Sequence, residues 1–286
     1  MTSFFAGDMQ LEQLTYTLII IMLSTAALCF IVSEITQNYS QVDKLWSLMP
    51  VIYSFVTRAY FPSLRVWIMS ILVTAWGLRL SYNFSRKGGY NIIPWRGEED
   101  YRWKILRENP ALKGRFLFGV FNLLFISLYQ NFLILLLSTP LLMAAKYGNT
   151  QLNLLDAVAA ALMVLFLTIE TVADNQLFIF HKLKKDAKKP KGLYAKSIKK
   201  GFFSEGLWSY VRHPNFISEQ LIWVSFYLFG VSASGIWLNW TIAGAVLLIL
   251  LFIGSSEMTE RISSSKYPGY ADYKKQVPRY FPGINF

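Results

Sequence analysis

The chain has 286 residues, of which 54% are hydrophobic and only 16% charged, and its formal net charge is +11. This composition excludes an ordinary soluble domain, because long uncharged runs alternate with basic segments, as in proteins that cross a membrane several times. A single cysteine, Cys29, and two histidines exclude an intrachain disulfide and predict no metal site built from Cys and His.

Seven apolar segments are predicted to cross the membrane as helices, which makes residues 1–286 one all-α membrane domain. The first has no basic stretch before it, so we expect no cleaved signal peptide. The fourth carries polar residues and Pro140, which predict a kink or an inward polar face. In chain order the predicted spans are Leu14–Glu34, Leu45–Phe61, Leu64–Phe84, Phe116–Met143, Leu152–Phe180, Ile217–Val231 and Ile236–Ser255. The second and sixth are short for a bilayer that needs about 20 residues.

The positions of the basic residues predict the orientation. With seven spans, 24 of the 28 Lys and Arg residues fall on one side, at Lys44 and within 86–115, 182–212 and 256–286. The positive-inside rule makes that side cytosolic, with the N-terminus outside and the C-terminus in the cytosol. Lysines at the lipid headgroups account for the net charge without nucleic acid. We therefore expect membrane lipids as partners, in a bacterial inner membrane or the endoplasmic reticulum.

Ionisable residues inside the predicted spans need a reason, because each costs roughly 2.5–3.5 kcal/mol on insertion scales. Arg79 lies in the third span, and Glu170 and Asp174 lie four residues apart on the fifth, with His181 beyond them. Two interpretations stay open. Arg79 can neutralise one of the acids in an internal ion pair. Alternatively, these residues line a cytosol-facing cavity, where the acids accept hydrogen bonds from a nucleotide and the arginines bind its phosphates.

The segment GLWSYVRHPNFISEQLIW is the most informative part of the chain. Pro214 suits the first turn of a helix, and Arg212 and His213 place hydrogen-bond donors just before it. Asn215 and Glu219 are four residues apart and so share a helix face. A charged face that opens a membrane helix predicts a site for an anionic cofactor with a polar head.

Several weaker candidates lie outside this segment. Asp43 immediately precedes the second span. Asp100 is either a helix cap or a cofactor contact, with neither interpretation favoured. Tyrosines are frequent in the C-terminal segment KYPGYADYKKQVPRYFPGINF, which includes Tyr270, and Tyr210 precedes the Arg-His-Pro-Asn element. They form either an aromatic belt at the membrane interface or a lid that stacks on adenine.

Six motifs give the chain a resemblance to a known family over nearly its whole length. They are VDKLWSLMP (42–50), WGLRLSYN (76–83), GEEDYRW (97–103), ETVADNQ (170–176), GLWSYVRHPNFISE (206–219) and KYPGYADYKK (266–275). The chain resembles the steroid 5α-reductase family, in the bacterial-type branch labelled as a domain of unknown function. Its Arg-His-Pro-Asn element is also shared with sterol C14- and C7-reductases, and is similar to an element of isoprenylcysteine methyltransferases.

The resemblance implies seven helices around NADPH, which enters from the cytosolic side, and hydride transfer to an enone carbon. Asp43 stands where the family has its ketone-binding acid. Trp76 occupies the position of the ketone-binding tyrosine, so Tyr82 is the nearest substitute. Asn215 and Glu219 match the pair that contacts the nicotinamide, and we expect Asp43, Tyr82 and Glu219 to be catalytic.

The same resemblance supplies the predicted NADPH-binding set. Asp174 matches a cofactor-binding aspartate, Glu170 a cofactor-binding asparagine, and His181 a phosphate-binding arginine. Ser256 and Glu260 replace a histidine and a tyrosine of the family, so that part of the cofactor site is altered. The full predicted set is Arg79, Glu170, Asp174, His181, Tyr210, Arg212, His213, Asn215, Glu219 and Tyr270.

The expected function is therefore NADPH-dependent reduction of a C=C bond conjugated to a carbonyl in an apolar lipid, foremost the Δ4 bond of a 3-oxo steroid. Two alternatives stay open. One is an S-adenosylmethionine-dependent methyltransferase of the isoprenylcysteine type, and the other is a non-catalytic lipid-binding membrane protein. Retention of cofactor binding distinguishes the second alternative from the enzymes.

Overall fold

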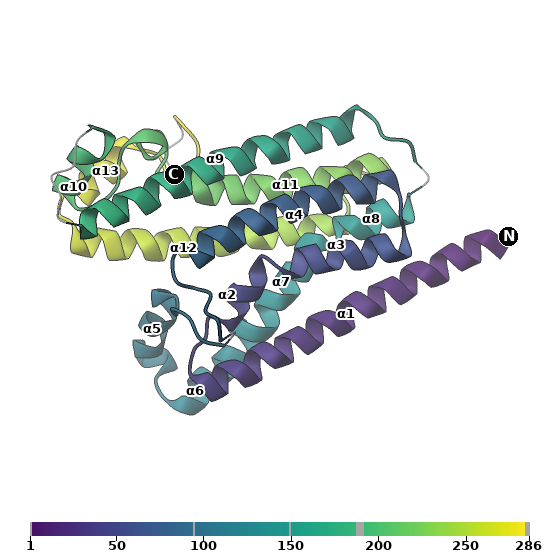
Figure 1. Cartoon of the computed structure of the whole chain (residues 1–286), viewed down its shortest axis with the longest axis horizontal. Coiled ribbons are helices and arrows are strands. Elements are labelled where there is room, and N and C mark those ends of the chain that lie inside the picture. Colours follow the sequence, from purple (N-terminus) through teal and green to yellow (C-terminus); the bar gives the residue numbers. More distant parts are fainter. Residues whose placement is uncertain (1, 94, 149, 187–191, 284–286) are drawn as a thin grey trace. The chain divides into compact units, whose positions relative to one another are not determined.

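The computed structural model describes residues 2–93, 95–148, 150–186 and 192–283, and within these ranges all regular structure is helical (Figure 1). The helices are α1 (Thr2–Thr36), α2 (Gln41–Trp46), α3 (Met49–Tyr60), α4 (Leu64–Ser85), α5 (Tyr101–Glu108), η1 (Pro110–Leu112), α6 (Arg115–Phe121), η2 (Asn122–Tyr129), α7 (Gln130–Ser138), α8 (Pro140–Lys146), α9 (Leu154–Lys185), η3 (Gly192–Tyr194), α10 (Ala195–Lys200), η4 (Gly206–Ser209), α11 (Pro214–Ser234), η5 (Trp240–Ile242), α12 (Ala243–Lys266) and α13 (Tyr270–Gln276).

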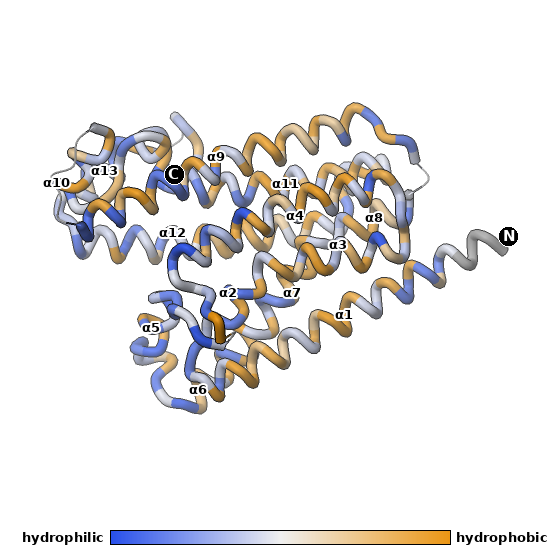
Figure 2. Tube along the Cα trace, in the orientation of Figure 1, coloured by the Kyte–Doolittle hydropathy of each residue, from blue (hydrophilic) through white to orange (hydrophobic). Residues whose placement is uncertain are grey.

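Within the described residues, six helical segments are long and apolar enough to cross a membrane, as in a multi-pass membrane protein. They are Gly7–Thr36, Leu64–Ser85, Arg115–Lys146, Leu154–Lys185, Pro214–Ser234 and Trp240–Lys266. Figure 2 shows hydrophobic residues along the middle of α1 and α9, and hydrophilic residues around α5, α10 and α13.

The second predicted span, Leu45–Phe61, differs from the other six. Its residues form the end of α2 and the 12-residue helix α3. At 1.5 Å per residue α3 is about 18 Å long, well short of a hydrocarbon core of about 30 Å. Pro50 near the start of α3 and Phe61-Pro62 after it limit the helix at both ends.

The fourth predicted span has a break at Pro140 and buried Gln130 and Asn131 side chains, as predicted, and in addition a π-helix that the sequence did not predict. Residues Asn122–Tyr129 are wound as a π-helix between α6 and α7, and a break at Thr139 precedes α8, which begins at Pro140. In the π segment, the Asn122 side chain donates to Glu34 Oε1 on α1 at 2.7 Å and lies within 3.3 Å of Ser33 Oγ. The π-helix thus directs the polar Asn122 side chain toward α1.

The chain divides into two compact units. The first comprises Met1–Ala160 and Phe226–Ala245, and the second comprises Ala161–Ser225 and Val246–Phe286. In the first unit α1 packs along α3, α7 and α8, and α3 packs on α4. Gly77 permits that last contact, because a Cβ there would lie 2.7 Å from the Val51 side chain on α3 and 2.6 Å from the Ser47 carbonyl oxygen just before α3.

A buried ion pair ties α4 to α9 within the first unit. The Arg65 guanidinium donates to both Asp156 carboxylate oxygens, at 2.8 and 2.9 Å, and both side chains are buried. Arg65 also donates to Thr150 Oγ1 and to the Gln151 carbonyl. Its five donors therefore hold the α8–α9 connection in place, so Arg65 has a structural role.

In the second unit, aromatic side chains anchor the segments that connect α9 to α11 and follow α12. Phe180, Phe203 and Trp208 form one cluster. Phe202 packs with Tyr270, Tyr273 and Val277 in another. These contacts bring the Arg-His-Pro-Asn segment and α13 into one compact body.

Candidate functional site

The segment before α11 is docked on α9 by hydrogen bonds. Trp208 Nε1 donates to the Ala173 carbonyl at 3.2 Å, and the Leu207 amide donates to Gln176 Oε1 at 3.1 Å. Gly206 has φ +62°, and a Cβ at this position would lie 2.6 Å from the Gln176 side chain. A glycine is therefore required both for the backbone conformation and for the close approach.

Helix α11 begins at Pro214, as its sequence predicts, and its first turn faces α9. Asn215 Nδ2 donates to Asp174 Oδ1 at 3.1 Å. One turn further, Glu219 Oε1 accepts from Trp223 Nε1 at 2.9 Å. Glu170 lies one turn before Asp174 on α9. Three of these side chains, those of Glu170, Asp174 and Glu219, are carboxylates buried to 4–5% exposure; we call them the acid row.

Asn215 carries an acceptor that the described chain does not satisfy. Its Oδ1 atom is buried and makes no hydrogen bond within residues 2–93, 95–148, 150–186 and 192–283. A buried amide oxygen without a partner is costly and rare, so it needs an explanation. Four acceptor groups on facing turns of two helices form a surface suited to a ligand rich in N–H and O–H donors.

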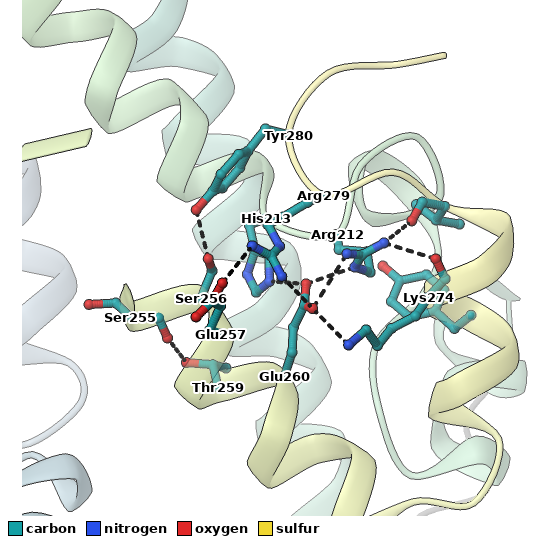
Figure 3. Close-up of polar contacts among 12 residues, drawn as sticks. Arg212, His213, Ser255, Ser256, Glu257, Thr259, Glu260, Lys274, Arg279 and Tyr280 are labelled. Atoms are coloured by element: carbon teal, nitrogen blue, oxygen red, sulfur yellow. Dashed lines mark hydrogen bonds and ion pairs between the residues drawn. The ribbon is translucent and has the colours of Figure 1, made fainter. Parts of the chain in front are cut away.

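A second buried group, the Glu260 cluster, lies at the start of α11 (Figure 3). The Glu260 carboxylate is 1% exposed and is contacted by four basic side chains. Arg212 Nε donates to Oε1 at 2.8 Å, and His213 Nε2 lies 3.0 Å from the same oxygen. Lys274 Nζ and Arg279 Nη2 each lie 3.3 Å from Oε2.

The Glu260 cluster also fastens the segment after α13 to the loop before α11. The Arg212 amide donates to the Pro278 carbonyl at 2.8 Å, and the His213 amide donates to the Arg279 carbonyl at 3.2 Å. Arg212 Nη1 donates to the Lys274 and Val277 carbonyls. All three guanidinium nitrogens of Arg212 are thus engaged by the protein itself.

The electrostatics of the Glu260 cluster favour a neutral His213. Burial lowers the pKa of this imidazole, and its hydrogen bond to Glu260 only partly opposes the shift. Arg212 and Arg279 add to the lowering because they repel a second cation. His213 also stacks on Phe216 at a centroid distance of 5.2 Å, which fixes the plane of the ring.

In the first unit, the structure places Asp43 against Trp103. Trp103 Nε1 donates to Asp43 Oδ2 at 2.9 Å. Burial raises the pKa of Asp43, partly offset by Arg102. Arg102 is itself paired with Asp100 at 2.8 Å. Asp100 is the N-cap of α5, because its side chain accepts from the Arg102 amide; this confirms the interpretation of Asp100 as a helix cap.

Two further predicted residues of the first unit lie on α4. Tyr82 is 66% exposed, and the Arg86 guanidinium lies 5.4 Å from its ring centroid. Arg79 is partly buried. Trp76, at the family's tyrosine position, is fully buried.

The remaining predicted residues of the second unit are spread over its surface and core. His181 is exposed on α9, with Phe180 edge-on at 5.2 Å. Tyr210 is 66% exposed. Tyr270 is 6% exposed and packs edge-on against Phe202 at 5.1 Å, and burial raises its pKa to about 12. The structure therefore brings together Asp174, Asn215, Glu219 and Glu170, and separately Arg212 and His213.

Sequence reasoning missed the central residue of the second group. Glu260 was noted only as a replacement for a family tyrosine, yet it joins side chains from three segments of the second unit. In the sequence, Glu260 is followed by basic residues at 274 and 279, but this spacing does not indicate that Glu260 also pairs with Arg212.

Comparison with known proteins places the chain in a family. A family model described as "Protein of unknown function (DUF1295)" matches residues 29–277. The chain belongs to this family. An uncharacterized protein of Schizosaccharomyces pombe, C594.04c, is 37% identical over 266 residues, which cover 89% of this chain and 75% of the yeast protein. No solved structure matches the chain. The predicted branch of unknown function is confirmed, and kinship to steroid 5α-reductases stays a prediction.

Proposed function

We propose that the protein is an NADPH-dependent membrane oxidoreductase that reduces a C=C bond conjugated to a carbonyl in a lipid, with a Δ4-3-oxo steroid as the first substrate to test. The observation that carries the proposal is the hydrogen bond between Asn215 and Asp174 beside the unsatisfied Asn215 Oδ1 atom. This pair places buried hydrogen-bond acceptors in the Arg-His-Pro-Asn segment, one of the motifs that carry the resemblance to steroid 5α-reductases.

The residues of the acid row fit the polar part of a nicotinamide nucleotide. A carboxamide NH₂ group donates two hydrogen bonds, for which Asn215 Oδ1 and the Glu219 carboxylate are acceptors. Ribose hydroxyls are donors that the carboxylates of Asp174 and Glu170 can accept. When bound, NADPH would supply the hydride; the protein would bind it, orient it and keep water away.

Arg212 and His213 have a supporting part in this proposal. Their side chains are held by Glu260, and their amides by the carbonyls of residues 278 and 279. They fix the backbone from which α11 starts, and so fix the direction in which Asn215 points. A shift of about 1 Å in such a residue can cost on the order of a hundredfold in rate.

Asp43 is the proposed donor to the substrate carbonyl. A raised pKa favours the protonated carboxyl, which can donate a hydrogen bond to an oxygen that gains negative charge. The Trp103 indole donates to Oδ2 and so holds the carboxyl group in place. We expect Asp43→Asn to leave NADPH binding intact and to reduce enone turnover at saturating NADPH; loss of NADPH binding with normal turnover would contradict this role.

The proposal is tested first by ligand-induced thermal stabilisation of the purified protein. We expect NADPH to raise the melting temperature more than NADH does, because the 2′-phosphate adds charge recognised by the basic cytosolic face. NADPH consumption with a Δ4-3-oxo steroid then tests the reaction. Stabilisation by S-adenosylmethionine without a response to NADPH would instead identify a methyltransferase, and no response to either would favour a lipid-binding protein.

We further propose that Leu45–Phe61 completes a seventh crossing, with the N-terminus outside and the C-terminus in the cytosol. The support is the basic-residue asymmetry of the sequence. Cysteines at the exposed positions Asp8 and Lys113 should then be labelled from opposite sides of the membrane, because three crossings separate them. Labelling from the same side would leave two crossings and reject the seventh. The native Cys29 is buried and gives little background.

A further inference from the structure

A cavity of about 460 Å³ lies in the first unit where two membrane helices end. It is lined by Glu34, Ile35, Gln37, Tyr39, Arg107, Leu112, Gly114, Arg115 and Phe118. One candidate span ends at Thr36 and another begins at Arg115. Figure 1 shows α6 beside this end of α1. The cavity therefore lies at the membrane–water interface, where phospholipid headgroups are found.

The walls of the cavity are held rigidly. Tyr39 packs edge-on against Phe118 at 4.7 Å, and its amide donates to Glu99 Oε1 at 2.9 Å. Arg107 pairs with Glu99, and its guanidinium donates to the Gln37 carbonyl at 3.2 Å. Gln37 has φ +55° and returns its side chain to the Glu34 carbonyl. A preformed cavity of this size is typical of ligand sites.

The charges around the cavity are of both signs. Burial first, and then Glu34 and Glu99, raise the pKa of the Tyr39 phenol, whereas Arg107 and Arg115 lower it. The Arg107 guanidinium lies 5.2 Å from the Tyr39 ring centroid, and Glu34 and Arg115 line the same cavity as Tyr39. The Arg115 side chain is exposed and makes no hydrogen bond or ion pair within the described ranges. Glu34 uses Oε1 to accept from Asn122, and its carboxylate has further acceptor capacity.

Exposed apolar side chains continue from the cavity toward the hydrocarbon region. Ile35 on α1 is 75% exposed, and Phe116 and Leu117 on α6 are 81% and 51% exposed. An acyl chain can pack along this surface. A ligand that matches the whole arrangement carries a phosphate for Arg115, an ammonium for Glu34 and an apolar tail.

We propose that this cavity is a binding site for an aminophospholipid, that is, a membrane lipid with a phosphodiester and a primary ammonium such as phosphatidylethanolamine. Arg115 contacts the phosphate, and Glu34 accepts hydrogen bonds from the ammonium. A quaternary choline headgroup has no N–H to donate, so it binds more weakly. The site is independent of the proposed reductase activity.

The test is titration of the detergent-purified full chain with micelles that contain phosphatidylethanolamine, phosphatidylcholine or phosphatidylglycerol, read as melting temperature and as lipid retained in native mass spectrometry. We expect phosphatidylethanolamine to stabilise the protein most. Arg115→Gln should weaken its binding roughly tenfold, as should Glu34→Gln, which keeps an acceptor for Asn122. Lys113→Gln removes a neighbouring exposed charge that does not line the cavity, and should have little effect.

Three results would overturn the proposal. Equal effects of Arg115→Gln and Lys113→Gln would reduce the site to general surface charge. Phosphatidylglycerol binding as tightly as phosphatidylethanolamine, with no effect of Glu34→Gln, would show selection for anionic lipid. Stabilisation by soluble glycerophosphoethanolamine as strong as by the lipid would mean that the membrane is not the source of the ligand.

Discussion

The acid row and the Glu260 cluster are both built from buried carboxylates of the second unit, yet their surroundings differ. Glu260 is contacted by two arginines, a lysine and a histidine. In the acid row, Asp174 accepts from the Asn215 amide and Glu219 from the Trp223 indole, beside the buried Asn215 Oδ1 atom that no group of the described residues satisfies. A carboxylate held by four basic groups fixes structure, whereas the acid row lies next to an acceptor that a ligand can satisfy. Mutations in the Glu260 cluster should therefore lower stability, whereas mutations in the acid row should mainly weaken ligand binding.

The largest effect is expected for Glu260→Gln. This change leaves the buried Arg212 guanidinium without its counter-charge, and breaking a buried pair in this way typically costs about 3–5 kcal/mol. Unfolding followed in detergent should show a melting temperature far below that of the parent. A near-normal melting temperature would mean that the Glu260 cluster is not what holds the C-terminal segment.

Glu219→Gln should change ligand binding more than stability. Glutamine keeps the shape of the side chain and can still accept from Trp223. The weaker neutral acceptor should reduce NADPH affinity by about ten- to a hundredfold, or roughly 1.5–3 kcal/mol. The measurement is a NADPH titration of both proteins by fluorescence or calorimetry. Unchanged affinity would assign Glu219 to helix packing alone.

The Glu260 cluster should also make stability depend on pH. Because the pKa of His213 is lowered in the folded state, the unfolded chain binds its proton first as pH falls. Stability should therefore be complete above about pH 6.5 and fall by up to about 1.4 kcal/mol per pH unit, down to the folded-state pKa. Between pH 7.5 and 5, the melting temperature of the parent should fall more steeply with decreasing pH than that of His213→Gln. Parallel curves would exclude protonation of His213 as a cause of the pH dependence.

The smallest effect is expected for Glu257→Gln, which serves as the matched control for Glu260→Gln. Glu257 lies one turn away on α12, is half-exposed, and lies 3.7 Å from Arg279 Nη1. Exposed pairs of this kind contribute about 0–1 kcal/mol. A loss as large as that of Glu260→Gln would show that charge on this face of α12, and not burial, controls stability.

Local sequence signals predicted much of the fold. Pro214 marked the start of α11, and Pro140 marked the break in the fourth span. The cap at Asp100 was one of two open interpretations. The four-residue spacing of Asn215 and Glu219 placed them on one helix face. These features depend on residues within about two helical turns, where backbone geometry follows from sequence.

Partners distant in sequence were not predictable. Nothing in the sequence pairs Arg65 with Asp156, which is 91 residues away. Arg212 and His213 were assigned to a ligand, although Glu260, 48 and 47 residues further on, contacts both. The pairing of acidic with basic side chains depends on tertiary packing. A single sequence does not contain the information that would predict these pairs. The length of α3 could not be predicted either, because the apolar composition of the sequence extends beyond the residues that form the helix.

The backbone hydrogen bonds from Arg212 and His213 to residues 278 and 279 have a consequence for biosynthesis. A ribosome synthesises the Arg-His-Pro-Asn segment well before residues 270–280, with α12 in between. Until residues 278 and 279 have been made, the Arg212 and His213 amides lack these carbonyl partners, so the motif acquires its final geometry only when the C-terminal segment is in place. A chain truncated after α12 should therefore keep the six candidate membrane spans of the described residues but lack the Lys274 and Arg279 contacts of the Glu260 cluster.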